Sequence, residues 1–188
     1  MDPLHVLTHR RSTSSRALAE PGPDPGQLAA MLACAVHVPD HGKLAPWRFL
    51  LIRGPARDSL GELLARRSLE KFPGAAPASV EKDRMRFRHA PLIVAVIACL
   101  TPGHKVPEQE QLLSGGAACL SLLQAADALG FGAQWLTGWP AYDPVVLERL
   151  GVGPSERVLG FIHVGTATLP AEERERPDAA SLTSELSP

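Results

Sequence analysis

The stretch LIVAVIACL, from Leu92 to Leu100, decides the fold of this 188-residue chain. All nine residues are apolar, none alternates with a polar residue, and four are β-branched. A run of this length and composition is typical of a strand that is buried on both faces. The sequence therefore predicts a sheet that is covered by helices on both sides.

Three further segments with strand composition accompany this run: residues 47–53 (WRFLLIR), 132–138 (GAQWLTG) and 158–166 (VLGFIHVGT). Helix signals occupy residues 2–9, 25–37, 55–70, 79–89, 108–129 and 144–151. This mixture predicts one α+β domain with about four strands over residues 1–170. The charged and then Ser/Pro-containing residues 171–188 are expected to form an extended tail.

The helix expected from Pro25 to His37 carries the clearest local signals. Asp24 is a favourable N-cap residue, and proline is favoured at the first helical position. Apolar residues also recur at helical spacing, which gives the helix a side that faces the core. That side is predicted to contain Leu28, Met31, Leu32 and Ala35.

The segment 108–129 is the longest helical segment, and no charge interrupts it between Glu110 and Asp127. Such a helix is expected either in a large core or at an oligomer interface. About 16 uncharged residues are too few for a membrane span, which needs ~20. The pair Gly115-Gly116 predicts close backbone packing.

Composition narrows the possible partners. Hydrophobic residues make up 45% of the chain and charged residues 21%, and the formal net charge is -1. We therefore expect neither a nucleic-acid nor a membrane partner. The N-terminus lacks a secretory signal, and Cys34, Cys99 and Cys119 form no CxxC pair, so buried free thiols and a cytoplasmic location are expected.

Several common site motifs are missing. There is no GxxxxGK[ST] phosphate loop, and Gly151-x-Gly153 lacks the third glycine of a dinucleotide fingerprint. His37 and His41 are separated by Pro39, which prevents them from sharing a helix face. No metal site is expected.

A basic segment near the N-terminus, Arg10-Arg11-Ser12, is the first candidate binding motif. Guanidinium and hydroxyl donors suit the oxygens of a phosphate, although a basic run can also be a solvated surface. Other segments are unusual for plain structure, and together they could line one site for a flat ring and a phosphate. These are residues 39–41, 46–49, 135–139 and 165–166.

The order and spacing of the motifs resembles the FMN-dependent nitroreductase family over residues 4–168. The resemblance is strongest to its small, minimal NAD(P)H nitroreductase branch. The motifs that carry it are HRRSTSSR at 9–16, VPDHGK at 38–43 with APWRF at 45–49, HKVPEQE at 104–110, GFGAQWLTG at 130–138 and GFIHVGT at 160–166.

The resemblance implies a nitroreductase-like fold, with a mostly antiparallel sheet of four to five strands, and an intertwined homodimer with FMN at its interface. Arg10 and Ser12 would bind the FMN phosphate, and Arg11 would lie over the ribityl chain or ring edge. Further contacts would come from His37 and His41 of the partner subunit, from Trp135, Leu136 and Thr137 along the flavin, and from Gly165 and Thr166 at the phosphate end.

The implied activity is ping-pong hydride transfer, in which NAD(P)H and then a nitroaromatic, quinone or related acceptor use the same slot. A flavin-binding carrier or sensor, and a deazaflavin-using or flavin-modifying relative, are the alternatives. Two departures from the family pattern concern fine contacts. Ala45 replaces a frequent glutamine, and one residue is inserted after Ser12, which leaves Arg16 outside the predicted site.

Overall fold

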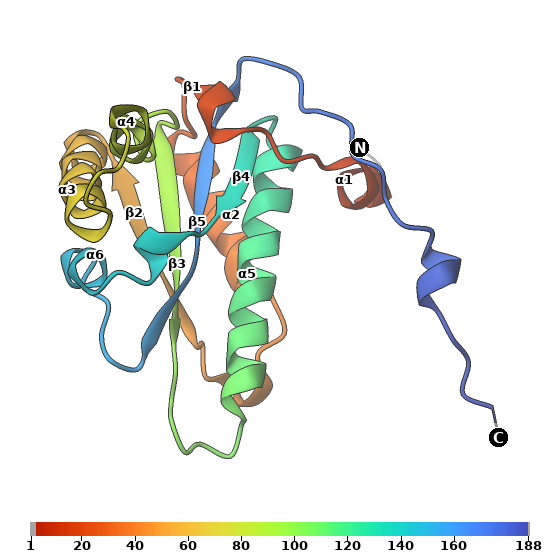
Figure 1. Cartoon of the computed structure of the whole chain (residues 1–188). Coiled ribbons are helices and arrows are strands. Elements are labelled where there is room, and N and C mark those ends of the chain that lie inside the picture. The colour runs from red at the N-terminus through yellow and green to blue at the C-terminus, as the bar shows by residue number, and fades with distance from the viewer. Residues whose placement is uncertain (1–2, 188) are drawn as a thin grey trace.

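The computed structural model describes residues 3–187 and has a five-stranded sheet at its centre (Figure 1). Strand β5 pairs with β3, which in turn pairs with β2, and β4 pairs along the opposite edge of β5, while the short β1 pairs with the last residues of β5. Every pair is antiparallel, which confirms the expected α+β class and sheet type. The strands are β1 Leu18–Ala19, β2 Trp47–Arg53, β3 Leu92–Cys99, β4 Gly132–Leu136 and β5 Glu156–Ala167.

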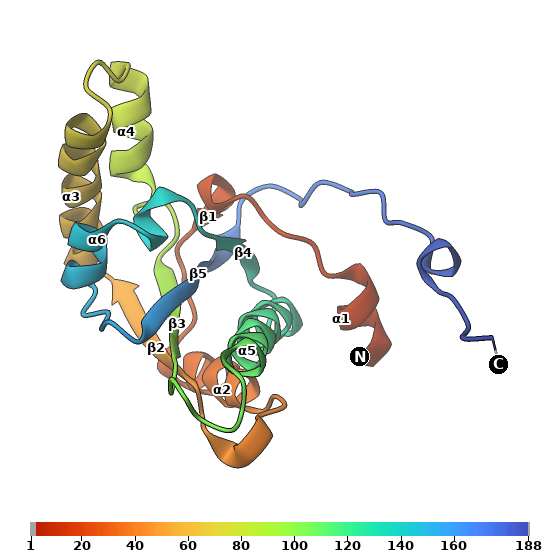
Figure 2. The same ribbon diagram turned by 60° about the horizontal axis from the view of Figure 1, so that its bottom comes forward.

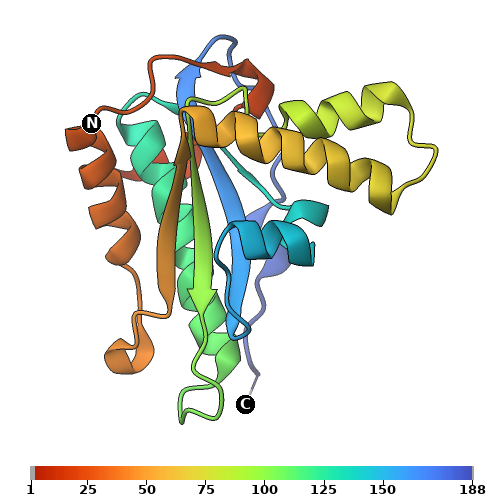
Figure 3. The same cartoon turned by 90° about the vertical axis from the view of Figure 1, so that its left-hand side faces the viewer.

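Helices cover both faces of this sheet. Helices α2 and α5 lie on one face, and α3, α4 and α6 lie on the other (Figures 2 and 3). Helix α1 lies beside α5. The bounds are α1 Pro3–His9, α2 Pro25–Val36, α3 Pro55–Lys71, α4 Pro77–Met85, α5 Glu108–Ala128 and α6 Pro144–Arg149. Short 3-10 turns occupy Ser15–Ala17, His41–Lys43, Trp139–Ala141 and Ala179–Leu182.

Strand β3 is buried on both faces, as its composition predicts. Leu92, Val94 and Val96 pack in the core that α2 and α5 cover. Alternate residues of the same strand pack in the core beneath α3 and α6, namely Ile93, Ala95 and Ile97. Because no water reaches either face, a continuous apolar run is the sequence that this position requires.

Helix α2 begins with the expected cap. The Asp24 carboxylate accepts a hydrogen bond from the Gln27 backbone N–H at 2.8 Å, and the Gln27 side chain accepts from the Asp24 N–H at 3.0 Å. The predicted apolar side is confirmed, with three residues buried and one partly buried: Leu28, Met31, Ala35 and Leu32.

The expectation of three buried cysteines was wrong for Cys34, which is exposed on the outer side of α2. Its neighbours Met31 and Ala35 occupy the inner side, so helical geometry turns residue 34 outward. Cys99 is half-buried, and only Cys119 is fully buried.

Helix α5 packs closely against β5 at one of its two glycines. A Cβ on Gly115 would lie 2.3 Å from Cδ1 of Leu159, whereas a Cβ on Gly116 would meet nothing within 4 Å. The apolar side chains of Leu113 and Leu120 face outward, 65% and 45% exposed. None of the helices within residues 3–187 is long and apolar enough to cross a membrane.

Element ends differ from the sequence expectations in a few places. Strand β1 has only two residues and was not predicted. Helix α4 stops at Met85 because residues 86–90 turn and bring Phe87 into the core. Residue 2, where the first helix was expected to begin, lies outside the described residues. After β5 the chain leaves the body in an extended path that ends at residue 187 (Figure 2).

Candidate functional site

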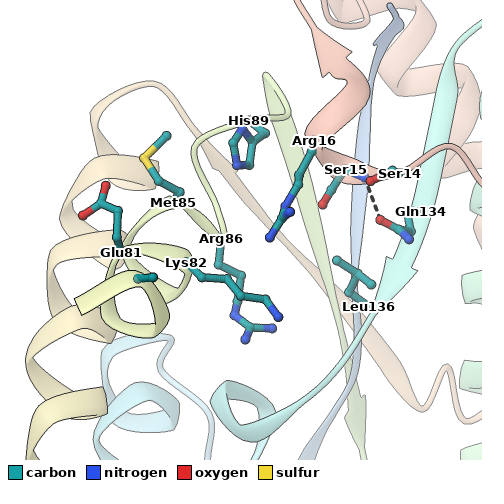
Figure 4. A pocket seen from close by; sticks show the side chains of 11 residues that line it. Ser14, Ser15, Arg16, Glu81, Lys82, Met85, Arg86, His89, Gln134 and Leu136 are labelled. Carbon is teal, nitrogen blue, oxygen red and sulfur yellow. Dashed lines mark hydrogen bonds between the residues drawn. The ribbon is translucent and has the colours of Figure 1, made fainter. Parts of the chain in front are cut away.

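A cavity of about 620 Å³ lies between the N-terminal segment, strand β4 and helix α4 (Figure 4). Ser14, Ser15 and Arg16 line it together with two residues of β4, Gln134 and Leu136. The opposite wall is α4 and the turn after it, with Ala78, Glu81, Lys82, Met85, Arg86 and His89.

The N-terminal segment is fixed against β4 by its backbone. The Thr13 N–H donates to the Ala133 carbonyl at 3.0 Å, and the Ser15 N–H donates to Oε1 of Gln134 at 2.6 Å. A Cβ on Gly132 would lie 2.7 Å from Cδ2 of Leu18 and 3.0 Å from Oγ1 of Thr13, so a larger residue would require these side chains to shift. The predicted phosphate motif and the predicted flavin strand therefore lie side by side.

Strand alternation divides the predicted β4 residues between the two faces of the sheet. Leu136 lines the cavity, whereas Trp135 packs on the opposite face over Gly160. The Trp135 indole N–H donates to the Leu159 carbonyl at 3.0 Å, and a Cβ on Gly160 would lie 1.9 Å from that nitrogen. Thr137 follows the strand and is exposed.

Arg10 is half-buried, and its Nη1 atom is buried without a hydrogen-bond partner among the described residues. Burial lowers the pKa of this guanidinium; the positive charges of Arg176 and Arg11 also lower it, while Asp127 opposes them. A buried donor without a partner costs free energy, which an anionic ligand would recover.

The two residues that follow Arg10 in the motif, Arg11 and Ser12, have different surroundings. Arg11 pairs with Glu173 of the tail, with Nη2 at 2.8 Å from the carboxylate, and also donates to the His9 carbonyl at 2.9 Å. Ser12 is exposed. Neither residue lines the cavity.

His37 and His41 lie at the other end of the sheet, in the segment that joins α2 to β2 (Figure 1). His37 follows the last turn of α2, and Nδ1 of His41 lies 2.6 Å from Oε2 of Glu110 at the start of α5. Both histidines are exposed, and neither lines this chain's own cavity.

Gly165 and Thr166 do not line the cavity. They belong to the end of β5 that pairs with β1, where Thr166 lies opposite Ala19. The Thr166 hydroxyl donates to the Pro21 carbonyl at 2.7 Å, and a Cβ on Gly165 would lie 2.6 Å from Pro91.

Sequence reasoning missed the charged wall of the cavity. Arg16, which the apparent insertion had placed outside the site, reaches into the cavity opposite Lys82 and Arg86 (Figure 4). The only available signal was the charged character of the helix expected over 79–89. Charge alone did not say which side of that helix would face a cavity.

Two histidines close to this wall favour the neutral state. Burial and the charge of Arg16 lower the pKa of His89. His163 is 1% exposed and stacks on Phe87, and burial with the charges of Arg86 and His89 lowers its pKa to about 4. Residues 3–187 contain no group of three or more His, Cys, Asp or Glu side chains arranged to hold a metal ion.

Comparison with known proteins identifies the family and agrees with the fold. The sequence model of the nitroreductase family matches residues 7–166. The "Putative NAD(P)H nitroreductase YdjA" of Escherichia coli (strain K12) is 37% identical over 171 residues, which are 91% of each chain. The chain therefore belongs to the nitroreductase family.

Two solved structures share the fold. A nitroreductase-like family protein from Bacillus cereus superposes with a TM-score of 0.83 at 21% identity, over 99% of this chain and 96% of that one. A nitroreductase with bound FMN from Bacteroides fragilis NCTC 9343 superposes with a TM-score of 0.71 at 22% identity, over the full length of both chains.

Proposed function

We propose that this protein is an FMN-dependent oxidoreductase that uses NAD(P)H to reduce nitroaromatic, quinone or related acceptors. The cavity beside β4 carries the proposal, together with the unpartnered buried guanidinium nitrogen of Arg10 in the same N-terminal segment. The family membership, the name of the E. coli relative and the FMN bound to the B. fragilis protein support it.

The residues present fit an FMN phosphate at Arg10. Its buried Nη1 needs an acceptor, and the charge of Arg176 acts on the same guanidinium. Charge-assisted bonds to phosphate oxygens would satisfy this donor, and Ser12 offers an exposed hydroxyl two residues later. Arg11 is already engaged by Glu173, so its proposed contact with the ribityl chain requires the tail to release it.

The ring would lie along the wall formed by residues 14–16 and β4, with Leu136 and the backbone of Trp135 and Thr137 following its edge. Bound FMN would supply the hydride and electron transfer. The chain's own residues position the ring, exclude water and provide cationic groups, of which Arg16 is closest to this wall. Such groups stabilise negative charge that develops during reduction.

A homodimer would complete the site. The uncharged outer side of α5 exposes Leu113 and Leu120, and the extended tail leaves the body where it could reach a second copy. His37 and His41 do not line their own cavity, as expected of residues that serve the partner's site. NAD(P)H and the acceptor would then use the shared slot in turn.

The absorbance spectrum of the purified protein tests the function. We expect a flavin spectrum that bleaches with NADH or NADPH and recovers when a nitroaromatic or quinone is added. Binding of FMN without turnover would favour a carrier or sensor, and the mass of the released ligand would identify a deazaflavin. A colourless protein that cannot be reconstituted with FMN would contradict the proposal.

Arg10→Ala tests the phosphate contact. It should weaken FMN binding by roughly 1.5–3 kcal/mol, the typical contribution of a charge-assisted hydrogen bond. Arg66→Ala, which removes an exposed arginine from α3, should leave the FMN dissociation constant unchanged. Equal affinities for Arg10→Ala and wild type would reject this role.

Sedimentation velocity tests the dimer. Leu113→Glu places a charge on the outer side of α5 and should shift the protein towards the monomer. Leu69→Glu is the matched control, because Leu69 is 52% exposed on α3, on the other side of the sheet. A wild-type monomer would refute the shared site.

A further inference from the structure

Helix α4 presents two cationic side chains to the cavity, Lys82 and Arg86, and Arg16 faces them from the opposite wall (Figure 4). The only acid in the lining, Glu81, points away from them and accepts a hydrogen bond from Nε of Arg84 at 3.0 Å. The cavity therefore gathers positive charge without an acid directed into it.

The side chains of these three cations have N–H groups that no other residue within 3–187 occupies. Among the described residues neither Lys82 nor Arg16 has an ion-pair or hydrogen-bond partner. Arg86 is held from behind, since its Nη2 lies 2.8 Å from Oδ1 of Asp83. Its Nε atom is buried and has no hydrogen-bond partner in the described chain.

The support behind Arg86 is itself ordered. Asp83 is 6% exposed, and the Trp139 indole N–H lies 3.3 Å from both carboxylate oxygens. This arrangement fixes the orientation of the guanidinium. Because Nη2 is held by Asp83 and Nε is buried, Nη1 is the nitrogen that can donate to an oxyanion. His89 and His163 add no charge at neutral pH, because the pKa of each is lowered.

We infer that Lys82 and Arg86 form an anion subsite that holds a carboxylate or phosphate of the second ligand in this cavity. The inference rests on the proposed function, in which the flavin ring occupies the opposite wall. The FMN phosphate is proposed at Arg10, which does not line the cavity, so it does not account for these two cations. The anionic group belongs either to the electron acceptor or to the 2′-phosphate of NADPH.

Equilibrium binding to the FMN-loaded protein is the first test. Benzoate and benzamide differ in charge and are similar in shape, and neither is reduced. Calorimetry should show benzoate binding about tenfold tighter, as one charge-assisted contact supplies. Lys82→Gln should abolish most of that preference, and Arg86→Gln should do the same.

Arg84→Gln is the matched control. Arg84 lies on the same helix but does not line the cavity, and it pairs with Glu62 and Glu81, so this variant should keep the preference. Arg86→Gln also leaves the buried Asp83 without its ion-pair partner and can weaken folding. Lys82→Gln breaks no such pair and tests the subsite by itself. Equal binding of benzoate and benzamide, or a preference that survives both substitutions, overturns the inference.

Kinetics of the loaded enzyme assign the source of the anion. If Lys82→Gln lowers the ratio of kcat/KM for 4-nitrobenzoate to that for 4-nitrobenzamide and leaves the NADPH to NADH ratio unchanged, the anion belongs to the acceptor. If the same variant lowers only the ratio of kcat/KM for NADPH to that for NADH, the anion belongs to the nucleotide. If neither ratio changes in Lys82→Gln, the subsite is rejected. The proposed function still stands in that case if the enzyme reduces the neutral acceptor 4-nitrobenzamide.

The two proposals can fail separately. If the protein does not bind FMN, the proposed function fails. Benzoate binding to the FMN-free protein then still tests whether Lys82 and Arg86 recognise an anion, with loss in both variants as the supporting result.

Discussion

The two faces of the sheet are covered in different ways. Beneath α2 and α5 the contacts are apolar and depend on close approach, as at Gly115. Beneath α3, α4 and α6 an apolar core is overlaid by most of the molecule's ion pairs and by the cavity. One sheet thus supports an uncharged face suited to association and a charged face suited to ligands.

Removing the buried acid of the charged face should have the largest effect on stability. Asp143 is fully buried, pairs with Arg67 at 3.0 Å and Lys71 at 3.2 Å, and caps α6 through the Val145 and Val146 N–H groups. Asp143→Ala loses the pairs and the cap, so we expect a loss of about 3 kcal/mol in chemical denaturation.

Glu70→Gln is the control for that change. Glu70 also pairs with Arg67, but its side chain is 58% exposed, and an exposed pair contributes about 0–1 kcal/mol. If the two variants were equally stable, burial of the charge would not be what distinguishes this face.

Glycines at the two faces should respond differently to a methyl group. A Cβ on Gly61 would lie 2.3 Å from the backbone carbonyl oxygen of Arg84, which cannot move without shifting α4. Gly61→Ala should therefore cost about 2–3 kcal/mol. At Gly115 the neighbour is the flexible end of Leu159, and alanine's better helix propensity offsets the strain, so Gly115→Ala should change stability by about 1 kcal/mol or less.

Thermal and denaturant unfolding of Gly61→Ala and Gly115→Ala measures the loss in unfolding free energy at each position. An equal loss at both positions would mean that the uncharged face is as rigid as the charged one.

Mild acid should weaken the charged face through His163. Its folded-state pKa is about 4, below the ordinary 6.5, so the unfolded chain takes up the proton first as pH falls. Stability should therefore be full above pH 6.5 and fall towards pH 4, by about 2 kcal/mol between pH 7.5 and pH 5. Denaturation across this range should show the slope in wild type and a much smaller slope in His163→Leu, because the lowered pKa of His89 contributes the remainder. A slope that persists in full in the variant would assign the effect to other groups.

The smallest effect is expected at the rim of the charged face. Asp58 lies 2.8 Å from Nε of Arg88, and its side chain is 65% exposed. Asp58→Asn should cost less than about 1 kcal/mol, and added salt should remove most of that difference. A larger and salt-resistant loss would mean that the ion pairs of this face act as a connected network.

Local signals were enough for much of the fold. The apolar run of β3 predicted its burial, and Asp24 with Pro25 predicted the start of α2, because each depends on neighbouring residues alone. Strand β1 was not predictable, since two residues carry no periodicity and pair only with the end of a strand about 150 positions later.

The site depended on long-range geometry that the sequence does not encode locally. The face on which Trp135 packs follows from the pairing register of β4 and from the space left by Gly160. Arg16 enters the cavity because residues 13–15 are bonded to β4, which sequence spacing did not reveal. The sequence singled out Arg10 as a candidate phosphate-binding residue. That its Nη1 atom is buried without a hydrogen-bond partner could be found only in the structure.

The central place of β5 has a consequence for biosynthesis. This strand follows all of its partners in the chain, and two of them, β1 and β3, are synthesised long before it. Until β5 has been synthesised, β3 has an open apolar edge and β4 lacks its partner strand. Long-range pairing of this kind folds slowly and exposes strand edges meanwhile. Nascent chains of this protein should therefore depend on chaperones until β5 has emerged and paired.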